Sequence, residues 1–259
     1  NQRVFLRSMH MLGVILQESG DLEKALFYLD SALVLSKKMN DQKRIGQLYN
    51  SIGATYLRKG DWKKSINYTF MAARVKEESG DKEGAVTSLL NIGLQYSKLH
   101  DYDKAIQYCL QALEACKKYK LTAFYSYSLT RLGIHYFENG DLILSEKYLN
   151  AALDTIDTKT SPALAVPVLS SLSEIYYRNN DAVKMKNTLS QMDELVALLN
   201  EENYVNELNM HYGEYYYLIK DYKQAEYYSE KSWKASAKDQ DAVGEGLTGS
   251  LEIYVDALK

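Results

Sequence analysis

The sequence predicts an all-α array of about thirteen helices packed in antiparallel pairs, because three columns of residues repeat at an interval of forty. The first column is an Asp at 21, 61, 101, 141, 181 and 221. The second column holds small residues: Gly13, Gly53, Gly93, Gly133, Ser173 and Gly213. The third column is mostly aromatic: Leu16, Tyr56, Tyr96, Tyr136, Tyr176 and Tyr216. A fixed period of this kind indicates stacked repeats and not one closed core.

Each repeat is expected to form two amphipathic helices. Apolar residues recur at spacings of three and four, as in Leu26, Leu29 and Leu33, and this stripe is typical of a helix with one buried face. The small residue of the second column lets a partner helix approach closely, and the Tyr three positions later fills the adjacent space.

The repeats span approximately residues 1–40, 41–80, 81–120, 121–160, 161–200 and 201–240, followed by a terminal unpaired or capping helix within 241–259. The helices are expected at 2–18, 22–39, 41–58, 62–79, 81–98, 102–119, 121–138, 142–157, 162–178, 182–199, 201–218, 222–238 and 241–258.

The turn between the two helices of a repeat has a local chemical cause. Gly20, Gly60 and Gly140 suit the left-handed residue that ends a helix, and the Asp that follows can cap the next helix through its carboxylate. In the fifth repeat, Pro167 lies inside an expected helix, so we expect it to delay the first turn or bend the helix.

Composition narrows the class of protein. Apolar residues make up 46% of the chain and charged residues 25%, which predicts a folded, soluble protein. The formal charge of −3 is spread over 31 basic and 34 acidic residues, so nucleic acid is not favoured as a partner and membrane contact is not expected. The chain begins at Asn1, from which we expect a fragment or a processed form. The compartment, cytoplasmic or periplasmic, and the oligomeric state stay open.

We expect no enzymatic activity and no cofactor. The sequence contains no Gly-rich phosphate loop, no nucleophile elbow and no His-Glu-x-x-His helix. The four His, at 10, 100, 135 and 211, fall in different repeats. Cys109 and Cys116 are interpreted as small apolar residues without the further ligands that a metal site needs.

The columns resemble the tetratricopeptide repeat in a lengthened form of forty residues. The resemblance rests on Leu12-Gly13, Ile52-Gly53-Tyr56, Ile92-Gly93-Tyr96-Ala105-Ala112 and Leu132-Gly133-Tyr136, and it extends from Arg7 to about Ser232. It implies a right-handed α–α superhelix whose concave face is formed by the first helix of each repeat. It also implies a scaffold that binds a protein or peptide segment, as a module of a larger protein.

Residues that flank the small and aromatic columns and point away from the partner helix are the candidates for this binding groove. They are Arg7, His10, Gln47, Asn50, Arg58, Asn91, Lys98, Arg131, Ser171, Arg178, His211, Glu214 and Tyr217. In chaperone-binding members of the family, a Lys and Arg set with two Asn grips a terminal carboxylate. The matching early positions here are His10 and Val14, so that set is absent, and Asn91 with Arg131 does not restore it.

A second function accompanies this interpretation. The composition of the repeats is similar to that of bacterial regulatory proteins, which suggests a sensory or autoinhibitory module.

Two further sets of residues in the last repeat have an alternative interpretation. His211 and Glu214 lie one turn apart, and we expect a salt-linked surface pair there and not a metal site. Of Tyr212, Tyr215, Tyr216 and Tyr217, only Tyr217 is expected to face the groove.

Overall fold

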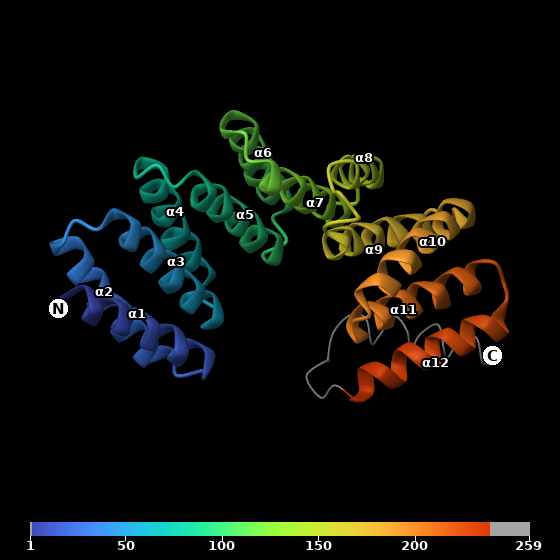
Figure 1. The fold of residues 1–259 in the computed structure, drawn as a ribbon, viewed down its shortest axis with the longest axis horizontal. Helices are drawn as coiled ribbons and strands as arrows, with labels where there is room; N and C mark the ends of the chain where they lie inside the picture. Colours follow the sequence, from blue (N-terminus) through green and yellow to red (C-terminus); the bar gives the residue numbers. More distant parts are fainter. Residues whose placement is uncertain (1, 239–259) are drawn as a thin grey trace. The chain divides into compact units, whose positions relative to one another are not determined.

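The computed structural model describes residues 2–238, and these form twelve α-helices in two compact units that divide between Asn139 and Gly140 (Figure 1). The first unit contains α1 (Gln2–Glu18), α2 (Leu22–Lys38), α3 (Gln42–Arg58), α4 (Trp62–Glu78), α5 (Lys82–Lys98), α6 (Tyr102–Tyr119) and α7 (Thr122–Glu138). The second unit contains α8 (Leu142–Leu153), α9 (Pro162–Arg178), α10 (Ala182–Leu199), α11 (Glu202–Leu218) and α12 (Tyr222–Lys238).

The helices pack as successive hairpins, which confirms the all-α fold class. In the first unit α1 packs on α2, α3 on α4 and α5 on α6, and each second helix also contacts the first helix of the next repeat. In the second unit α9 packs on α10 and α11 on α12, and α9 also contacts α11. One array through both units stays a prediction, and the helix predicted at 241–258 lies outside the described residues.

The predicted turns are confirmed at the level of backbone angles and hydrogen bonds. Gly20, Gly60 and Gly140 have φ values of 87°, 76° and 84°, and His100, Asn180 and Lys220 occupy the same left-handed region at the equivalent positions. The Asp of each repeat caps the next helix, with its carboxylate accepting a backbone N–H three residues later at 2.9–3.3 Å. Because these contacts are local, the turn has the same form in every repeat.

The small-residue column marks the closest approach of two helices. A Cβ added at Gly53 would lie 3.0 Å from Thr69 Oγ1 and 3.2 Å from the carbonyl oxygen of Ser65 on α4. A Cβ added at Gly213 would lie 2.5 Å from Ser229 Oγ on α12. The first helix therefore rests directly on the backbone and small side chains of its partner.

The aromatic column, which was expected to fill the space beside the close helix contact, pairs with tyrosines of the second helices and stays partly exposed. Tyr56 stacks on Tyr68, with ring centroids 5.5 Å apart, and Tyr216 stacks on Tyr228 at 5.4 Å. All four side chains remain half-buried. Their hydroxyl groups stay near water while the ring faces pack, which suits an amphipathic side chain at the edge of a hairpin.

One expectation about an individual helix was wrong. We expected a helix to 157, but α8 ends at Leu153, because Asp157 forms a turn of its own: its carboxylate accepts the N–H of Lys159 and the hydroxyl of Thr160. The helix that contains Pro167 runs from Pro162 to Arg178 as predicted, and Pro162 suits the first helical position, so Pro167 does not delay the first turn.

The core of the first hairpins leaves one face of α1 uncovered by the described residues. Leu29, Leu48 and Ile52 are fully buried between α1, α2 and α3. Phe5 is 61% exposed, whereas Ile45, its equivalent one repeat later, is 5% exposed because α2 packs against α3.

No helix among the described residues is long and apolar enough to cross a membrane.

Candidate binding face of the first helices

Successive first helices contact one another in a fixed register of 41 residues. Within the first unit, His10 Nε2 lies 2.9 Å from Ser51 Oγ, and Ser97 Oγ donates to Glu138 Oε2 at 2.7 Å. In the second unit, His211 Nε2 lies 2.8 Å from Ser170 Oγ. The side chain at one position therefore faces the position 41 residues further along the chain, one more than the repeat period.

Asn50 and Asn91 follow the same register on α3 and α5, but their amides stay available. Both side chains are half-buried, and neither forms a hydrogen bond to another described residue. Arg131 is the equivalent of Asn91 on α7, forty residues further along the chain. Its guanidinium carbon lies 6.0 Å from the ring centroid of Tyr127, and its buried Nε has no partner among the described residues. These three side chains offer unused hydrogen-bonding groups on neighbouring first helices.

The remaining groove candidates of the first unit differ in how far they are already engaged. Arg7 and Lys98 are exposed, and neither makes an ion pair within the described part of the chain. Arg58 donates through Nη1 to the carbonyl oxygen of Gln17 at 2.9 Å, and Gln47 accepts from Arg44 at 2.9 Å. The surface is thus partly pre-organised by its own polar contacts.

His10 is held neutral at the start of this face. Burial lowers its pKa below the ordinary 6.5, and the positive charge of Arg44 lowers the pKa further. A neutral ring can accept at one nitrogen while it donates at the other, so His10 can bond Ser51 in either tautomer.

The predicted surface pair His211 and Glu214 is instead buried, at 2% and 6% exposure. His211 Nδ1 lies 2.7 Å from Glu214 Oε2, so the imidazole joins Glu214 on α11 to Ser170 on α9. Burial by itself would lower the pKa of His211, but the charge and hydrogen bond of Glu214, with the charges of Glu207 and Glu174, outweigh it and raise the pKa above 6.5. The pair is buried and not on the surface because Ser170 is small and lets α9 pack closely over the imidazole ring of His211.

A second pair, the buried His135 and the exposed Glu138, was not among the candidates. His135 Nδ1 lies 2.8 Å from Glu138 Oε2, which also accepts from Ser97. Burial alone would raise the pKa of Glu138, yet the hydrogen bonds from His135 and Ser97 lower it. The His-x-x-Glu spacing that 135 and 211 share was the signal available in the sequence.

The thiol of Cys109 lies near His135, beneath Gly93. A Cβ added at Gly93 would lie 3.1 Å from Cys109 Sγ and 3.8 Å from His135 Nε2. Burial raises the pKa of Cys109 to about 12, so the thiol is not an activated nucleophile. Among the described residues, no group of three His, Cys, Asp or Glu side chains could hold a metal ion.

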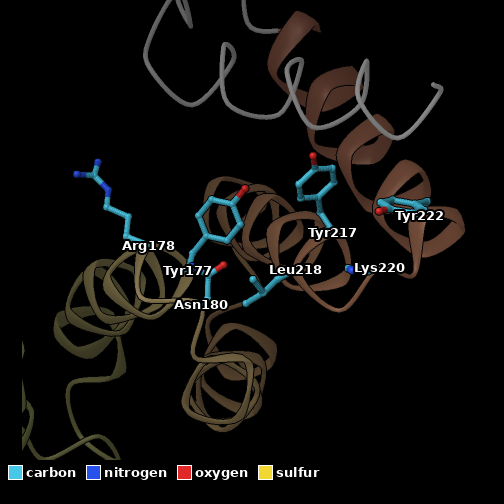
Figure 2. Close-up of a pocket in the computed structure, with 7 residues that line it drawn as sticks. All are labelled: Tyr177, Arg178, Asn180, Tyr217, Leu218, Lys220 and Tyr222. Carbon is cyan, nitrogen blue, oxygen red and sulfur yellow. The ribbon is translucent and has the colours of Figure 1, made fainter.

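The second unit contains a hollow of about 450 Å³ where α9 and α11 end (Figure 2). It is lined by Tyr177, Arg178, Asn180, Tyr217, Leu218, Lys220 and Tyr222. Two of the predicted groove residues, Arg178 and Tyr217, are thus brought together at one opening. Figure 2 shows the guanidinium of Arg178 extending away from the tyrosines, where its Nε donates to Glu174 at 2.8 Å.

Comparison with known families and structures agrees with this architecture. Two family models described as tetratricopeptide repeat match residues 6–38, 44–118 and 84–158, more than half of the chain. No curated protein sequence matches the chain.

Three solved structures illustrate the likeness. BtubC (BKLC) from P. vanneervenii is 20% identical, with a TM-score of 0.66 over 76% of this chain and 82% of that one. The signal transduction ATPase with a tetratricopeptide repeat sensor from Pyrococcus horikoshii is 18% identical, with a TM-score of 0.76 over 90% of this chain and 36% of that one. A Rap protein complexed with competence and sporulation factor is 13% identical, with a TM-score of 0.63 over 96% of this chain and 74% of that one. At these identities the likeness concerns the fold alone.

Proposed function

Because the chain belongs to the tetratricopeptide repeat family, we propose that the exposed face of its first helices binds an extended segment of a partner protein or a peptide. The observation that supports this most directly is the pair Asn50 and Asn91, whose amides are partly exposed and form no side-chain hydrogen bond within the described residues. An Asn amide both donates and accepts, so it can pair with the N–H and C=O groups of an extended backbone.

The register of the first helices supports a shared ligand for these two amides. At 41 residues apart, Asn50 and Asn91 correspond to His10 and Ser51, which are in direct contact. Two amides in that register face the same strip of surface. A single extended segment can therefore contact both of them, and Arg131 on the next first helix as well.

The charge of the predicted groove residues favours an acidic segment. In the first unit, Arg7, Arg58, Lys98 and Arg131 are positively charged, and none of the groove candidates there is a carboxylate. Such a surface raises the association rate of an acidic ligand and disfavours a basic one. The Rap conjugation gene regulator of the plasmid pLS20, which has the same fold, is described in complex with the Phr* peptide, and this supports a peptide as the class of ligand.

The test is a selection from a display library of random twelve-residue peptides, followed by binding measurements on the enriched sequences by fluorescence anisotropy. We expect enrichment of acidic peptides. The double variant Asn91→Ala, Arg131→Ala should weaken their binding by about tenfold or more, because a desolvated polar contact to a charged group is worth about 1.5–3 kcal/mol.

A matched control separates binding from folding. Asn67 and Arg74 on α4 are exposed on a second helix, so the double variant Asn67→Ala, Arg74→Ala removes the same two residue types from another surface. The control should bind like the parent protein, and both variants should keep its melting temperature. Equal weakening by both double variants, or a library without enriched sequences, would contradict the proposal.

A sensory module is the second candidate. It is favoured by the likeness over 90% of the chain to the protein described as having a tetratricopeptide repeat sensor. In that case a bound peptide must favour one arrangement of the repeats over another. Small-angle scattering with and without a peptide from the library tests this. An unchanged scattering curve at saturation would contradict the sensory function and leave only the scaffold function.

A further inference from the structure

The hollow at the ends of α9 and α11 has the composition of a ligand site. Its volume of about 450 Å³ falls within the range of small-molecule pockets, which are mainly apolar and aromatic with a few polar groups. Tyr177, Tyr217 and Tyr222 contribute aromatic rings, and Leu218 adds an aliphatic side chain. The rings of Tyr217 and Tyr222 lie edge to face, with centroids 5.9 Å apart. A planar ring or a branched aliphatic group fits such walls.

The polar part of the lining is positive. None of the seven lining residues is a carboxylate, and Lys220 makes no ion pair with any residue that the structure describes. The other cation, Arg178, is already bonded to Glu174. Lys220 is therefore the group available to a negative charge on a ligand.

The position of Lys220 is fixed by an energetically unfavourable backbone. Its φ is 65°, in the left-handed region, at the position where three other repeats carry Gly. Its N–H donates to the carbonyl oxygen of Tyr217, and the N–H of Asn180 makes the same bond to Tyr177 in the preceding repeat. A lysine in this conformation costs about 1 kcal/mol relative to Gly, so a functional use of its ammonium group gives a reason for its presence.

We propose that this hollow binds an apolar or aromatic group that carries a carboxylate, with the ring or branched chain between the tyrosines and the carboxylate at Lys220 and the Asn180 amide. The same chemistry occurs in a free aromatic acid and in the last residue of a peptide that ends in Phe or Leu. The proposal deepens the binding function proposed above and rests on it, but it concerns residues of the second unit, whereas Asn50 and Asn91 belong to the first.

The test uses the full chain, with the methyl groups of Leu218 and the other leucines observed by NMR. The probes are N-acetyl-phenylalanine, its carboxamide and N-acetylglycine. We expect saturable shifts at Leu218 with N-acetyl-phenylalanine and binding of the carboxamide and of N-acetylglycine weaker by about tenfold. Lys220→Gln should abolish the preference for the acid over the amide, while Lys223→Gln, an exposed lysine on α12, should keep it.

Further arms identify the source of the ligand and the outcomes that refute the site. A hexapeptide ending in Phe that binds more tightly than N-acetyl-phenylalanine identifies a peptide terminus, and equal affinity identifies a free acid. No shift at Leu218 with N-acetyl-phenylalanine, or equal shifts with acid and amide, would overturn the proposal. The groove is tested separately, with library peptides and the Asn91→Ala, Arg131→Ala variant in the first unit, so a library without enriched sequences together with intact Leu218 shifts refutes the groove and not the hollow.

Discussion

His211 bridges two neighbouring first helices, with its Nε2 2.8 Å from Ser170 Oγ on α9 and its Nδ1 2.7 Å from Glu214 Oε2 on α11. The bond to Glu214 is buried and the bond to Ser170 is partly buried, and three carboxylates, those of Glu214, Glu207 and Glu174, act on the ring. The imidazole therefore couples the packing of α9 and α11 to its protonation.

This coupling predicts a specific dependence of stability on pH. The pKa of His211 is raised in the folded protein, so the native state holds a proton more tightly than the unfolded chain, whose pKa is near 6.5. The resulting stabilisation is complete below 6.5 and is lost as the pH rises through the folded pKa. Relative to His211→Gln, the free energy of unfolding of the parent protein should fall as the pH rises above about 6.5, as measured by urea titration.

His10 provides the opposite sign as a control. Its folded pKa is lowered by burial and by Arg44, so the parent protein should lose stability relative to His10→Gln as the pH falls below 6.5. Parallel stability curves for the parent protein and His211→Gln would refute the role of the buried ring.

Phe5 and Ile45 occupy equivalent positions but should tolerate polar substitution very differently. Phe5 is 61% exposed on α1, and Ile45 is 5% exposed beneath α2. Ile45→Ser should lower the free energy of unfolding by about 3–4 kcal/mol, because it removes a buried branched chain, whereas Phe5→Ser should change it by about 0.5 kcal/mol. Urea midpoints measure both, and equal losses would show that the face of α1 is covered in solution.

Gly53 and Gly46 lie on the same helix and test the close approach of helix pairs. Alanine normally stabilises a helix by about 1 kcal/mol relative to Gly. At Gly53 the added Cβ would meet the backbone oxygen of Ser65 at 3.2 Å, so Gly53→Ala should destabilise the protein by about 1–2 kcal/mol. At Gly46 the added Cβ would lie 2.9 Å from Cγ of Lys76, a buried side chain whose Nζ donates to Ser88, so Gly46→Ala should also destabilise the protein. A more stable Gly53→Ala variant would contradict the packing described here.

Lys120 ends α6 in a left-handed conformation, with a φ of 54°. Lys120→Gly should therefore raise the free energy of unfolding by about 0.5–1 kcal/mol, as measured by thermal and urea denaturation. Asn200 ends α10 with a φ of 50°, and Asn adopts this backbone readily. Asn200→Gly should accordingly have little effect, and an equal gain at both positions would mean that the side chain does not determine the strain.

The turns and hairpins could be predicted because their causes are local. The Asp cap and the left-handed residue depend only on residues adjacent in sequence, and each repeat ends its first helix with the same kind of turn. The end of α8 could not be read in the same way, because the apolar pattern continues through Ile156. There the carboxylate of Asp157 competes with the helix for nearby donors, which the periodicity does not reveal.

The burial of individual groove residues depends on the neighbouring repeat. His211 is covered because the facing residue, Ser170, is small and can bond the ring, whereas Asn91 at the equivalent position stays half-exposed. The hollow is formed by two turns from successive repeats, and no single stretch of sequence contains both. The columns thus predict which helix carries the face, but not which of its side chains remain available.

The short helix α8 shows that the repeats keep the forty-residue spacing of their Asp residues constant, and not the length of each helix. It has 12 residues where the other described helices have 17 or 18, yet Asp181 still follows Asp141 by forty, because residues 154–161 take up the difference. A residue inserted within α10 would rotate all later side chains of that helix by about 100°. The same insertion at 154–161 would only lengthen a connection, so a fluorescent label or a cleavage sequence can be placed there without misaligning the faces that follow.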